Sequence, residues 1–234
     1  RKGKNVILPK KNLGFSENFF YMCFGKIPNK EIVKAFDVSL ILYAEHSFNV
    51  STFTARTITS SLSDIHSAIT GAIGSLKGPL HGGANEAVMY MMNKIKKPEN
   101  ALKWINNALD KKEVVMGFGH RVYKKGDSRV PTMEKYFKKV SKIKNDKKFL
   151  KIYEIVKNVM IERKDIHPNV DFPTGPTYHL MGFDTDFFTP IFVLSRITGW
   201  SAHIMEQHAA NKLIRPLSKY SGEKHRKVML LNQR

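Results

Sequence analysis

The sequence contains a single cysteine and few acidic residues, and both shortages narrow the class of protein. Cys23 has no partner for an internal disulfide, which favours a reducing compartment. Because Cys23 lies in the apolar run at residues 19–24, we expect a buried structural thiol and not a nucleophile. Asp and Glu number 20 against 39 Lys and Arg, so the formal net charge is +19. Three origins of this charge stay open: solvated helix faces, a nucleic-acid surface, or steering of anionic substrates into a cleft.

Long apolar runs are missing, and strand-like alternation is scarce. No run reaches the length of a membrane span, and residues 1–4 (RKGK) lack the apolar core of a secretory signal. Since the first residue is Arg1 and not methionine, we expect a fragment, a processed form or an incomplete chain. Apolar residues recur at helical spacing along most of the 234 residues, which predicts an all-α fold.

Turn and cap residues divide this helical pattern into segments. Ser51 is expected to cap the second helix, Ser63 or Asp64 the third, and Gly199 is expected to close a later one. Between positions 135 and 151, lysines alternate with apolar residues at helical spacing, which predicts an amphipathic helix with a basic outer face. The predicted helices cover residues 29–45, 51–60, 64–73, 84–95, 149–162, 190–199 and 200–214, with two more that start at Pro98 and Pro131 and a polar arm from Ser221.

Three glycine- or proline-rich turns each hold one side chain that can transfer a proton. His81 lies in residues 78–85 (GPLHGGAN), just before a predicted helix whose dipole disfavours the charged imidazolium. His120 follows two glycines in residues 117–123 (GFGHRVY), where backbone N–H groups can approach a ligand closely. Asp171 lies in residues 169–175 (NVDFPTG), beside apolar neighbours that raise the pKa of a carboxyl group. Each has a structural alternative as a cap or turn residue, but the combination suits general acid–base catalysis. An enzyme is therefore the leading hypothesis.

Other arginines and histidines add less by themselves. His46, Arg196 and Arg215 each look structural in isolation, although guanidinium forks suit planar carboxylates. His203 and His208 are five residues apart and do not share one helix face, and the single cysteine offers no thiolate pair. No metal site is expected.

Several long stretches, in the same order along the chain, resemble the citrate synthase family and most closely its 2-methylcitrate synthase branch. The resemblance runs from about Phe19 to Ser221. The matching stretches are residues 42–56 (LYAEHSFNVSTFTAR), 78–86 (GPLHGGANE), 116–123 (MGFGHRVY), 126–131 (GDSRVP), 169–171 (NVD), 182–190 (GFDTDFFTP), 202–207 (AHIMEQ) and 214–216 (IRP).

The resemblance implies a catalytic mechanism built on the three turns. Asp171 would take the α-proton of an acyl-CoA thioester, and neutral His81 would stabilise the resulting enol. His120 would polarise the ketone of oxaloacetate while the carbon–carbon bond forms, and hydrolysis of the thioester would follow. Propionyl-CoA is the expected donor, giving 2-methylcitrate; acetyl-CoA, giving citrate, or activity with both is the alternative. The CoA thioester is a substrate, and neither a resident cofactor nor a metal is implied.

The resemblance also implies binding residues. His46, Arg129 and Arg196 match oxaloacetate-binding positions. Arg215 matches an arginine that reaches the site of a neighbouring subunit, which implies a homodimer. The residues that match a CoA-contacting backbone stretch are Val115, Met116, Gly117, Phe118 and Gly119, with Lys124 or Lys125 at the phosphates.

Two domains are expected from the same resemblance. Residues 1–81 and 182–234 would form a large helical domain, and residues 82–181 a small domain whose closure excludes water. Family members are longer at the N-terminus, so the large domain would be incomplete. The expected compartment is the bacterial cytoplasm, with the mitochondrial matrix as the alternative, and no membrane partner is expected. A truncated non-catalytic relic or a basic nucleic-acid-binding protein is the competing hypothesis from another class.

Overall fold

The computed structural model describes residues 6–123 and 125–234. Across these residues the chain folds into helices without a β-strand, and one isolated backbone bridge joins Phe118 to Pro168. This confirms the predicted all-α class. The helices are α1 (Phe15–Phe24), α2 (Lys30–Tyr43), α3 (Val50–Ser60), α4 (Ile65–Leu76), α5 (Ala84–Ile95), α6 (Pro98–Asp110), α7 (Val130–Ile143), α8 (Lys148–Lys164), α9 (Asp171–Met181) and α10 (Phe188–Ala209), with the short 3-10 helices η1 (Thr185–Phe187) and η2 (Leu231–Gln233).

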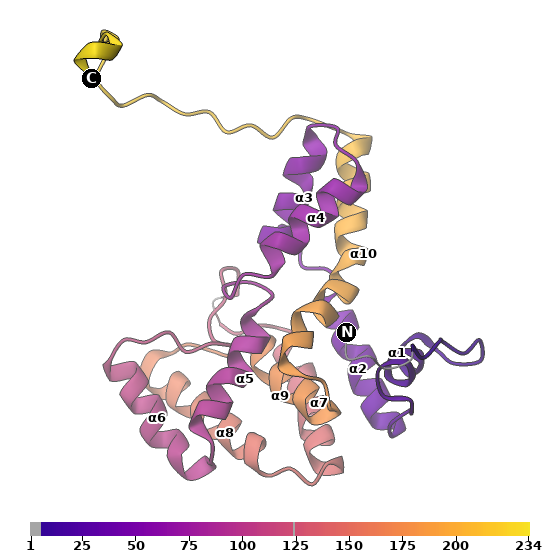
Figure 1. Ribbon diagram of the computed structural model, residues 1–234. Helices are drawn as coiled ribbons and strands as arrows, with labels where there is room; N and C mark the ends of the chain where they lie inside the picture. The colour runs from indigo at the N-terminus through magenta and orange to yellow at the C-terminus, as the bar shows by residue number, and fades with distance from the viewer. Residues whose placement is uncertain (1–5, 124) are drawn as a thin grey trace.

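Helices α3 and α4 form a hairpin that packs on α10 and rises above the rest of the molecule (Figure 1). Asn49 caps α3, since its side chain accepts a hydrogen bond from the Thr52 N–H at 3.1 Å. The prediction of Ser51 as the cap is therefore wrong: Ser51 is already the second helical residue, and Asn49 has the extended backbone that a cap needs. Asp64, one of the two predicted candidates, caps α4 by accepting from the Ser67 N–H.

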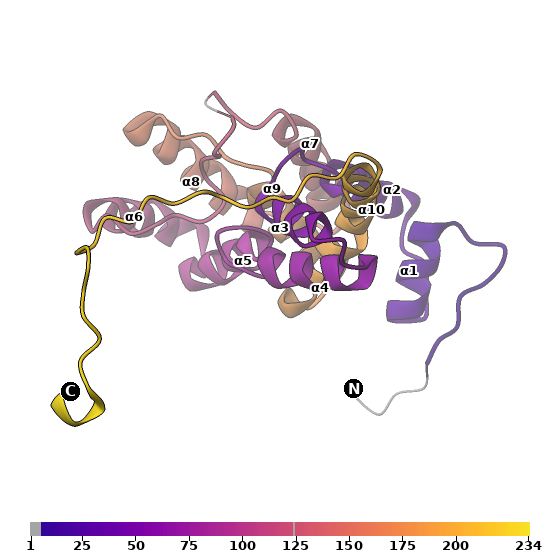
Figure 2. The ribbon, with the colours of Figure 1, turned by 90° about the horizontal axis from the view of Figure 1, so that it is seen from above.

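Helices α5 to α9 form a second group below this hairpin (Figure 1, and Figure 2 from above). Within the group, α5 and α7 pack on α9, and α6 packs on α8. Met89, Phe137, Tyr153 and Phe172 are fully buried in its core. Helix α2 joins the two groups, because it contacts α10, α7 and α9. The division into a domain of residues 82–181 and a second domain from the remainder stays a prediction.

Helix α7 is amphipathic, but the helical pattern predicted over positions 135–151 is divided, because α7 ends at Ile143, α8 begins at Lys148 and Asn145 between them has φ +51°. Met133, Phe137 and Val140 lie on its fully buried face. Lys135 and Lys139 lie on its exposed face. Solvated helix surface therefore accounts for part of the excess positive charge.

Helix α10 is continuous through Gly199, which corrects the prediction of two helices divided there. The C-terminal end of α2 crosses α10 at this glycine, and the Gly199 N–H donates to the Ala44 carbonyl at 3.2 Å. A side chain at position 199 would collide with Ala44 and Glu45. The glycine thus permits a close helix contact and does not end a helix.

The C-terminal segment leaves the helical body after Ala209 (Figure 1). The predicted helix to residue 214 is therefore too long at its end. Ser60, the last residue of α3, holds the start of the segment: its carbonyl accepts from Asn211 and its hydroxyl from the Ile214 N–H, both at 3.0 Å. From Leu217 onward the segment is exposed.

Cys23 is exposed, so the prediction of a buried thiol is wrong. Helix α1 packs on α2 through the buried Phe20, whose ring centroid lies 5.2 Å from that of Phe36. Met22 and Phe24, on either side of Cys23, are exposed as well. Cys23 lies on the exposed side of α1, and apolar sequence alone does not reveal which side of a helix its neighbours cover.

Candidate active site

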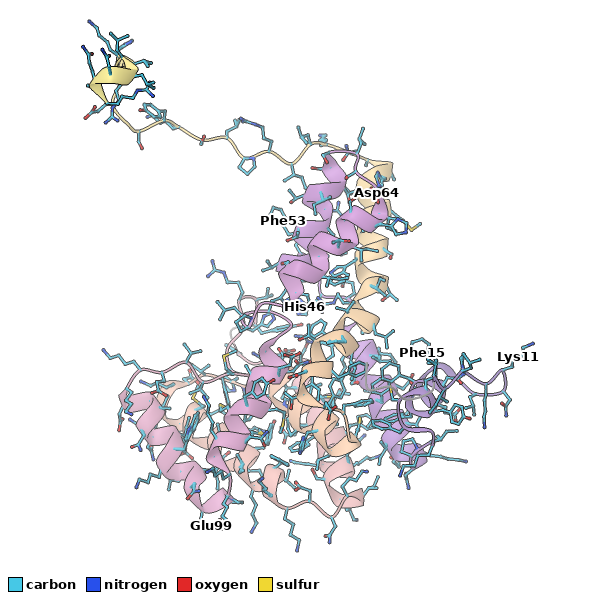
Figure 3. The ribbon with its side chains drawn as sticks, in the orientation of Figure 1. Lys11, Phe15, His46, Phe53, Asp64 and Glu99 are labelled. Atoms are coloured by element: carbon cyan, nitrogen blue, oxygen red, sulfur yellow. The ribbon has the colours of Figure 1, made fainter. Side chains whose placement is uncertain are left out.

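A cavity of about 540 Å³ lies where the α3–α4–α10 bundle meets the α5–α9 group. Figure 3 labels His46 at this junction. The predicted catalytic and oxaloacetate-binding residues that line the cavity are His46, His81, His120, Arg129, Asp171 and Arg196. The predicted CoA-contacting residues Val115, Met116, Gly117, Phe118 and Gly119 line it too. Side chains from separate parts of the sequence therefore face one space.

His81 lies in the turn before α5 and meets the N-terminus of α3. The Ser51 N–H donates to His81 Nε2 at 3.3 Å, and the Ser51 hydroxyl lies 2.8 Å from the same nitrogen. Because a backbone N–H can only donate, Nε2 is the acceptor and the ring proton belongs on Nδ1. Burial lowers the pKa of His81 to about 4, and the charge of Arg196 acts in the same direction. The N-terminus of α3, through the Ser51 N–H, therefore also disfavours the imidazolium, while the same effect of α5 stays a prediction.

His120 is held in the opposite tautomer. The N–H groups of Val122 and Tyr123 donate to His120 Nδ1 at 3.1 and 3.4 Å, so the ring proton belongs on Nε2. The rings of His46 and His120 have centroids 5.0 Å apart. Burial, followed by the neighbouring His46, lowers the pKa of His120. His120 therefore offers a neutral N–H donor.

The turn that precedes His120 depends on glycine at position 117. Gly117 has φ +86°, and a Cβ there would lie 2.8 Å from both Phe172 and Val88. The carbonyl of Gly117 accepts from the Asn169 N–H at 2.9 Å, and the Asn169 side chain donates to the Gly119 carbonyl at 3.0 Å. These bonds tie the His120 turn to the segment that leads into α9.

Asp171 is the first residue of α9, which corrects its placement in a loop between two prolines. The Tyr43 hydroxyl donates to Asp171 Oδ1 at 2.6 Å. Burial raises the pKa of Asp171 to about 6, although the Tyr43 hydrogen bond and the charge of Arg129 both oppose this rise. A carboxylate with such a pKa is ionised at neutral pH and is a stronger base than an exposed aspartate.

Arg129 is fixed by a bidentate ion pair with Asp127. Arg129 Nε donates to Asp127 Oδ1 at 3.0 Å, and Nη2 donates to Oδ2 at 2.7 Å. The Asp127 carboxylate also accepts from the N–H groups of Arg129 and Val170, each at 3.0 Å. Burial raises the pKa of Asp127, but the bonds from Arg129 outweigh it, and the pKa lies below its ordinary value. The Arg129 guanidinium is thus preorganised at the cavity wall.

Arg196 is almost completely buried, with 1% of its surface exposed. Its Nε donates to the carbonyl of Tyr43, and its Cζ lies 4.9 Å from the ring centroid of Phe192. Among the described residues, none makes a hydrogen bond to Arg196 Nη1. Burial lowers the pKa of Arg196 to about 10, and the charge of Arg129 adds to this. A buried cationic donor without a partner marks a place for an anion.

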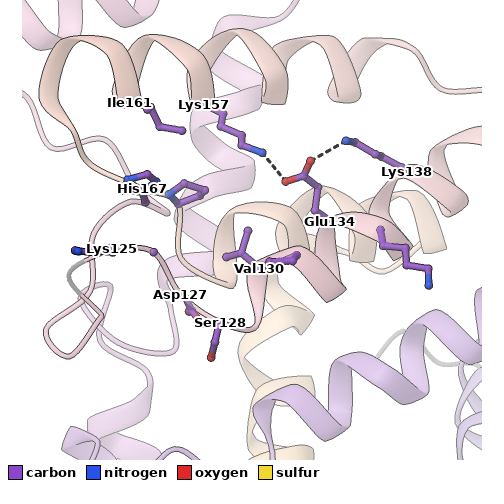
Figure 4. A pocket seen from close by; sticks show the side chains of 13 residues that line it. Lys125, Asp127, Ser128, Val130, Glu134, Lys138, Lys157, Ile161 and His167 are labelled. Atoms are coloured by element: carbon purple, nitrogen blue, oxygen red, sulfur yellow. Dashed lines mark hydrogen bonds and ion pairs between the residues drawn. The ribbon is translucent and has the colours of Figure 1, made fainter.

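Two predicted binding residues that the structure describes, Arg215 and Lys125, do not line this cavity. Arg215 is exposed beyond the far end of α10, and the fourteen residues from Arg196 to Ala209 alone span about 20 Å of helix. Lys124 lies outside the described residues. Lys125 lines a separate groove of about 740 Å³ (Figure 4).

This second groove is larger than the candidate active site, but different kinds of side chain line it. At its centre the Glu134 carboxylate accepts from Lys157 at 2.6 Å and pairs with Lys138 at 2.7 Å (Figure 4). His167 is the one histidine at its wall among the residues that the structure describes. An ion-pair cluster between α7 and α8 accounts for Glu134, Lys138 and Lys157 without a catalytic role.

Sequence reasoning missed three residues that support the site: Tyr43, Asp127 and Ser51. Asp127 carries a usable signal, because an acidic residue two positions before Arg129 is well placed for a bidentate pair. Tyr43 and Ser51 carry none, since their partners lie far away in the sequence, at Asp171 and His81.

Across residues 6–123 and 125–234, no group of three His, Cys, Asp or Glu side chains is arranged to hold a metal ion. In the same residues, no helix is both long and apolar enough to cross a membrane.

The fold and the cavity define a helical protein whose site holds two histidines protonated on different ring nitrogens, a buried carboxylate and two arginines. Residues 1–217 match the family described as citrate synthase, C-terminal domain. The chain belongs to the citrate synthase family.

Individual relatives support the same conclusion. The chain is 57% identical to 2-methylcitrate synthase 2 of Corynebacterium glutamicum, covering 100% of this chain and 62% of that protein. It is 56% identical to a citrate synthase of Mycolicibacterium smegmatis, covering 98% of this chain and 61% of that protein. The chain therefore spans about three fifths of the length of these relatives.

A solved structure adds a ligand-bound comparison. The citrate synthase of Thermoplasma acidophilum, in ternary complex with carboxymethyl coenzyme A and oxaloacetate, superposes with a TM-score of 0.89 at 39% identity. The match covers 97% of this chain and 62% of that one.

Proposed function

We propose that the protein condenses an acyl-CoA thioester with oxaloacetate, with propionyl-CoA as the preferred donor and 2-methylcitrate as the product. The observation that carries the proposal is the protonation of three side chains that line the cavity. His81 presents Nδ1–H, His120 presents Nε2–H and Asp171 presents a carboxylate, all at one space. A condensation between a carbon acid and a ketone needs one base and two hydrogen-bond donors of this kind.

The proton steps follow from these positions. Asp171 takes the α-proton of the thioester, and the electron pair moves onto the thioester oxygen, to which His81 Nδ1–H donates. Because the pKa of His81 is about 4, it stabilises the enolate as a neutral donor. The enolate carbon then attacks the ketone carbon, while His120 Nε2–H donates a hydrogen bond to the ketone oxygen. The proton that Asp171 took neutralises the resulting alkoxide and returns Asp171 to its ionised form. Water finally cleaves the thioester and releases CoA with a free thiol.

The arginines hold the two carboxylates of oxaloacetate. Arg129 is aligned by Asp127, and the unpartnered Nη1 of Arg196 supplies a buried donor among the described residues. Planar guanidinium groups match carboxylates better than lysine does. His46 completes this wall of the cavity: its ring centroid lies 5.0 Å from that of His120, and its Nε2 lies 3.2 Å from the Tyr123 hydroxyl.

Residues 115–119 would contact CoA through their backbone, with Lys124 or Lys125 at its phosphates. Closure of a small domain of residues 82–181 would exclude water until condensation is complete. CoA is a substrate in this scheme, and no step calls for a metal or a resident cofactor. The bacterial relatives favour a bacterial cytoplasm as the compartment.

We also propose that the protein is a homodimer in which each chain contributes Arg215 to the site of the other. Arg215 does not line the cavity of its own chain, and it belongs to the segment that leaves the helical body after α10 (Figure 1). Large apolar side chains are exposed on the same bundle, including Phe53, Ile73 and Met205. A homodimer would cover them and bring Arg215 to the partner's site.

The test is release of free thiol by the protein expressed from its complete reading frame. Oxaloacetate is offered with propionyl-CoA or acetyl-CoA, and we expect higher kcat/KM with propionyl-CoA. Asp171→Ala should abolish turnover while circular dichroism shows an unchanged helical fold. Full activity of this variant would remove Asp171 from the mechanism. Equal kcat/KM for both donors would refute the propionyl preference.

Citrate synthase activity with acetyl-CoA is the second candidate. The relative from Mycolicibacterium smegmatis, almost as similar as the one from Corynebacterium glutamicum, carries that name. One methylene in an apolar pocket changes selectivity by about 10–200-fold. The two donors are therefore separated by kinetics and not by the catalytic residues.

A further inference from the structure

We propose that Tyr43 is a positioning residue that fixes the Asp171 carboxylate, with one oxygen bonded and the other free to take the substrate proton. The inference rests on the function proposed above and concerns a residue outside the three catalytic groups. Tyr43 is the last residue of α2, and Asp171 is the first residue of α9. The hydrogen bond between them joins two helices at the floor of the cavity.

The contact distinguishes the two carboxylate oxygens of Asp171. The Tyr43 hydroxyl donates to Oδ1 at 2.6 Å, the length of a strong charge-assisted bond. Among the described residues, none donates to Oδ2. Proton abstraction therefore falls to Oδ2, while Oδ1 is held in place.

The Tyr43 side chain is itself fixed. It is fully buried, and its ring lies 4.0 Å from the Phe192 ring, centroid to centroid. Burial, followed by the negative charge of Asp171, raises the pKa of the Tyr43 hydroxyl well above its ordinary value. The phenol is a proton donor throughout the working pH range and does not compete as a base.

Three charged groups on two other elements also act on Asp171. Arg129 and Asp127 face it from the segment before α7, and Arg196 faces it from α10. Both arginines favour the ionised carboxylate, whereas Asp127 and burial oppose it. Tyr43 is the one described residue whose side chain donates a hydrogen bond to this carboxylate, and so sets its rotation as well as its charge.

Tyr43 also connects the base to the substrate-binding arginine. Its carbonyl accepts from Arg196 Nε, while its hydroxyl holds Asp171. One residue thus sets the position of the group that takes the proton relative to a group that binds the second substrate. A displacement of about 1 Å between such groups can reduce turnover by roughly a hundredfold.

Tyr43→Phe tests the inference, with Tyr178→Phe as the matched control. Tyr178 is also fully buried, and its hydroxyl bonds to Ser39 at 2.9 Å, again between α9 and α2. Both variants therefore lose one phenol hydroxyl from a hydrogen bond between the same two helices. The complete protein is assayed by thiol release from about pH 5 to 9, a range that brackets the Asp171 pKa of about 6. A second readout follows the ¹³C signal of the Asp171 carboxyl, which Asp171→Asn identifies.

We expect Tyr43→Phe to shift the acidic limb of the pH profile of kcat/KM to higher pH by about one unit, because a carboxylate that loses a charge-assisted donor becomes more basic. The ¹³C midpoint should rise equally, and kcat should fall by roughly 10–100-fold. Tyr178→Phe should change neither midpoint. An unchanged midpoint in Tyr43→Phe, or an equal shift in Tyr178→Phe, would overturn the inference.

The two readouts separate this inference from the proposed function. If the wild-type protein condenses substrates but Tyr43→Phe behaves like it, the inference alone fails. If the wild-type protein releases no thiol while the Asp171 midpoint still rises in Tyr43→Phe, the proposed function fails. The Tyr43–Asp171 link then stands as a structural fact.

Discussion

Replacing Asp127 with asparagine tests how Arg129 is held at the cavity wall. The substitution keeps the shape of the side chain and removes its charge. The asparagine side chain can still accept at Oδ1 from Arg129, but an amide NH₂ replaces Oδ2. This group then faces Arg129 Nη2 and the Val170 N–H, two donors that now lie 2.7 and 3.0 Å from Oδ2.

The magnitude follows from these contacts. The Asp127 side chain is fully buried, so solvent does not screen the loss. Two hydrogen bonds to a charged group disappear, at about 1.5–3 kcal/mol each, and a buried guanidinium loses its counter-charge. We expect a loss of about 3–5 kcal/mol in the free energy of unfolding, the range for a broken buried pair. We also expect KM for oxaloacetate to rise at least about tenfold, since the fork of Arg129 is no longer aligned.

Urea unfolding followed by circular dichroism measures the first effect, and initial rates of thiol release measure the second. Glu134→Gln is the control. The Glu134 carboxylate also receives two lysines, at 2.6 and 2.7 Å, but outside the cavity (Figure 4). Both variants should lose stability, whereas KM for oxaloacetate should rise in Asp127→Asn alone. Equal KM values in the two variants would refute the idea that Asp127 acts through Arg129.

Three further predictions concern other parts of the site. In the wild-type protein, kcat/KM should rise with pH through about 6, because Asp171 must be ionised to act as a base and its pKa is about 6; a rate that stays constant down to about pH 5 would contradict this assignment. Gly117→Ala should lower the free energy of unfolding by about 1–3 kcal/mol and reduce kcat, because φ is +86° and the new Cβ would lie 2.8 Å from Phe172 and Val88; thermal melts and turnover check both. Arg215→Ala should be inactive alone, and mixing it with Asp171→Asn subunits should restore activity if Arg215 acts on the neighbouring site; absence of recovery in verified mixed dimers would remove that role.

Local signals in the sequence were sufficient for most of the helices. The cap at Asp64 and the proline at position 98 mark real helix starts, because caps and first-turn prolines act through neighbouring backbone groups. The prediction of a helix end at Gly199 is wrong because the contact that requires a glycine there is not local in the sequence. The sequence shows a residue without a side chain, but it does not show that Ala44 approaches it from another helix.

The sequence by itself determined which groups are available for chemistry: His81 and His120 in glycine-containing turns, and Asp171, which the structure places at the start of α9. Only the tertiary structure decided how His81 and Asp171 work. The proton position on His81 depends on Ser51, thirty residues away, and the free oxygen of Asp171 depends on Tyr43, 128 residues away. The His81 tautomer, the orientation of the Asp171 carboxylate and the raised pKa of Asp171 arise from partners that packing brings together, whereas the His120 tautomer is set locally by the N–H groups of Val122 and Tyr123.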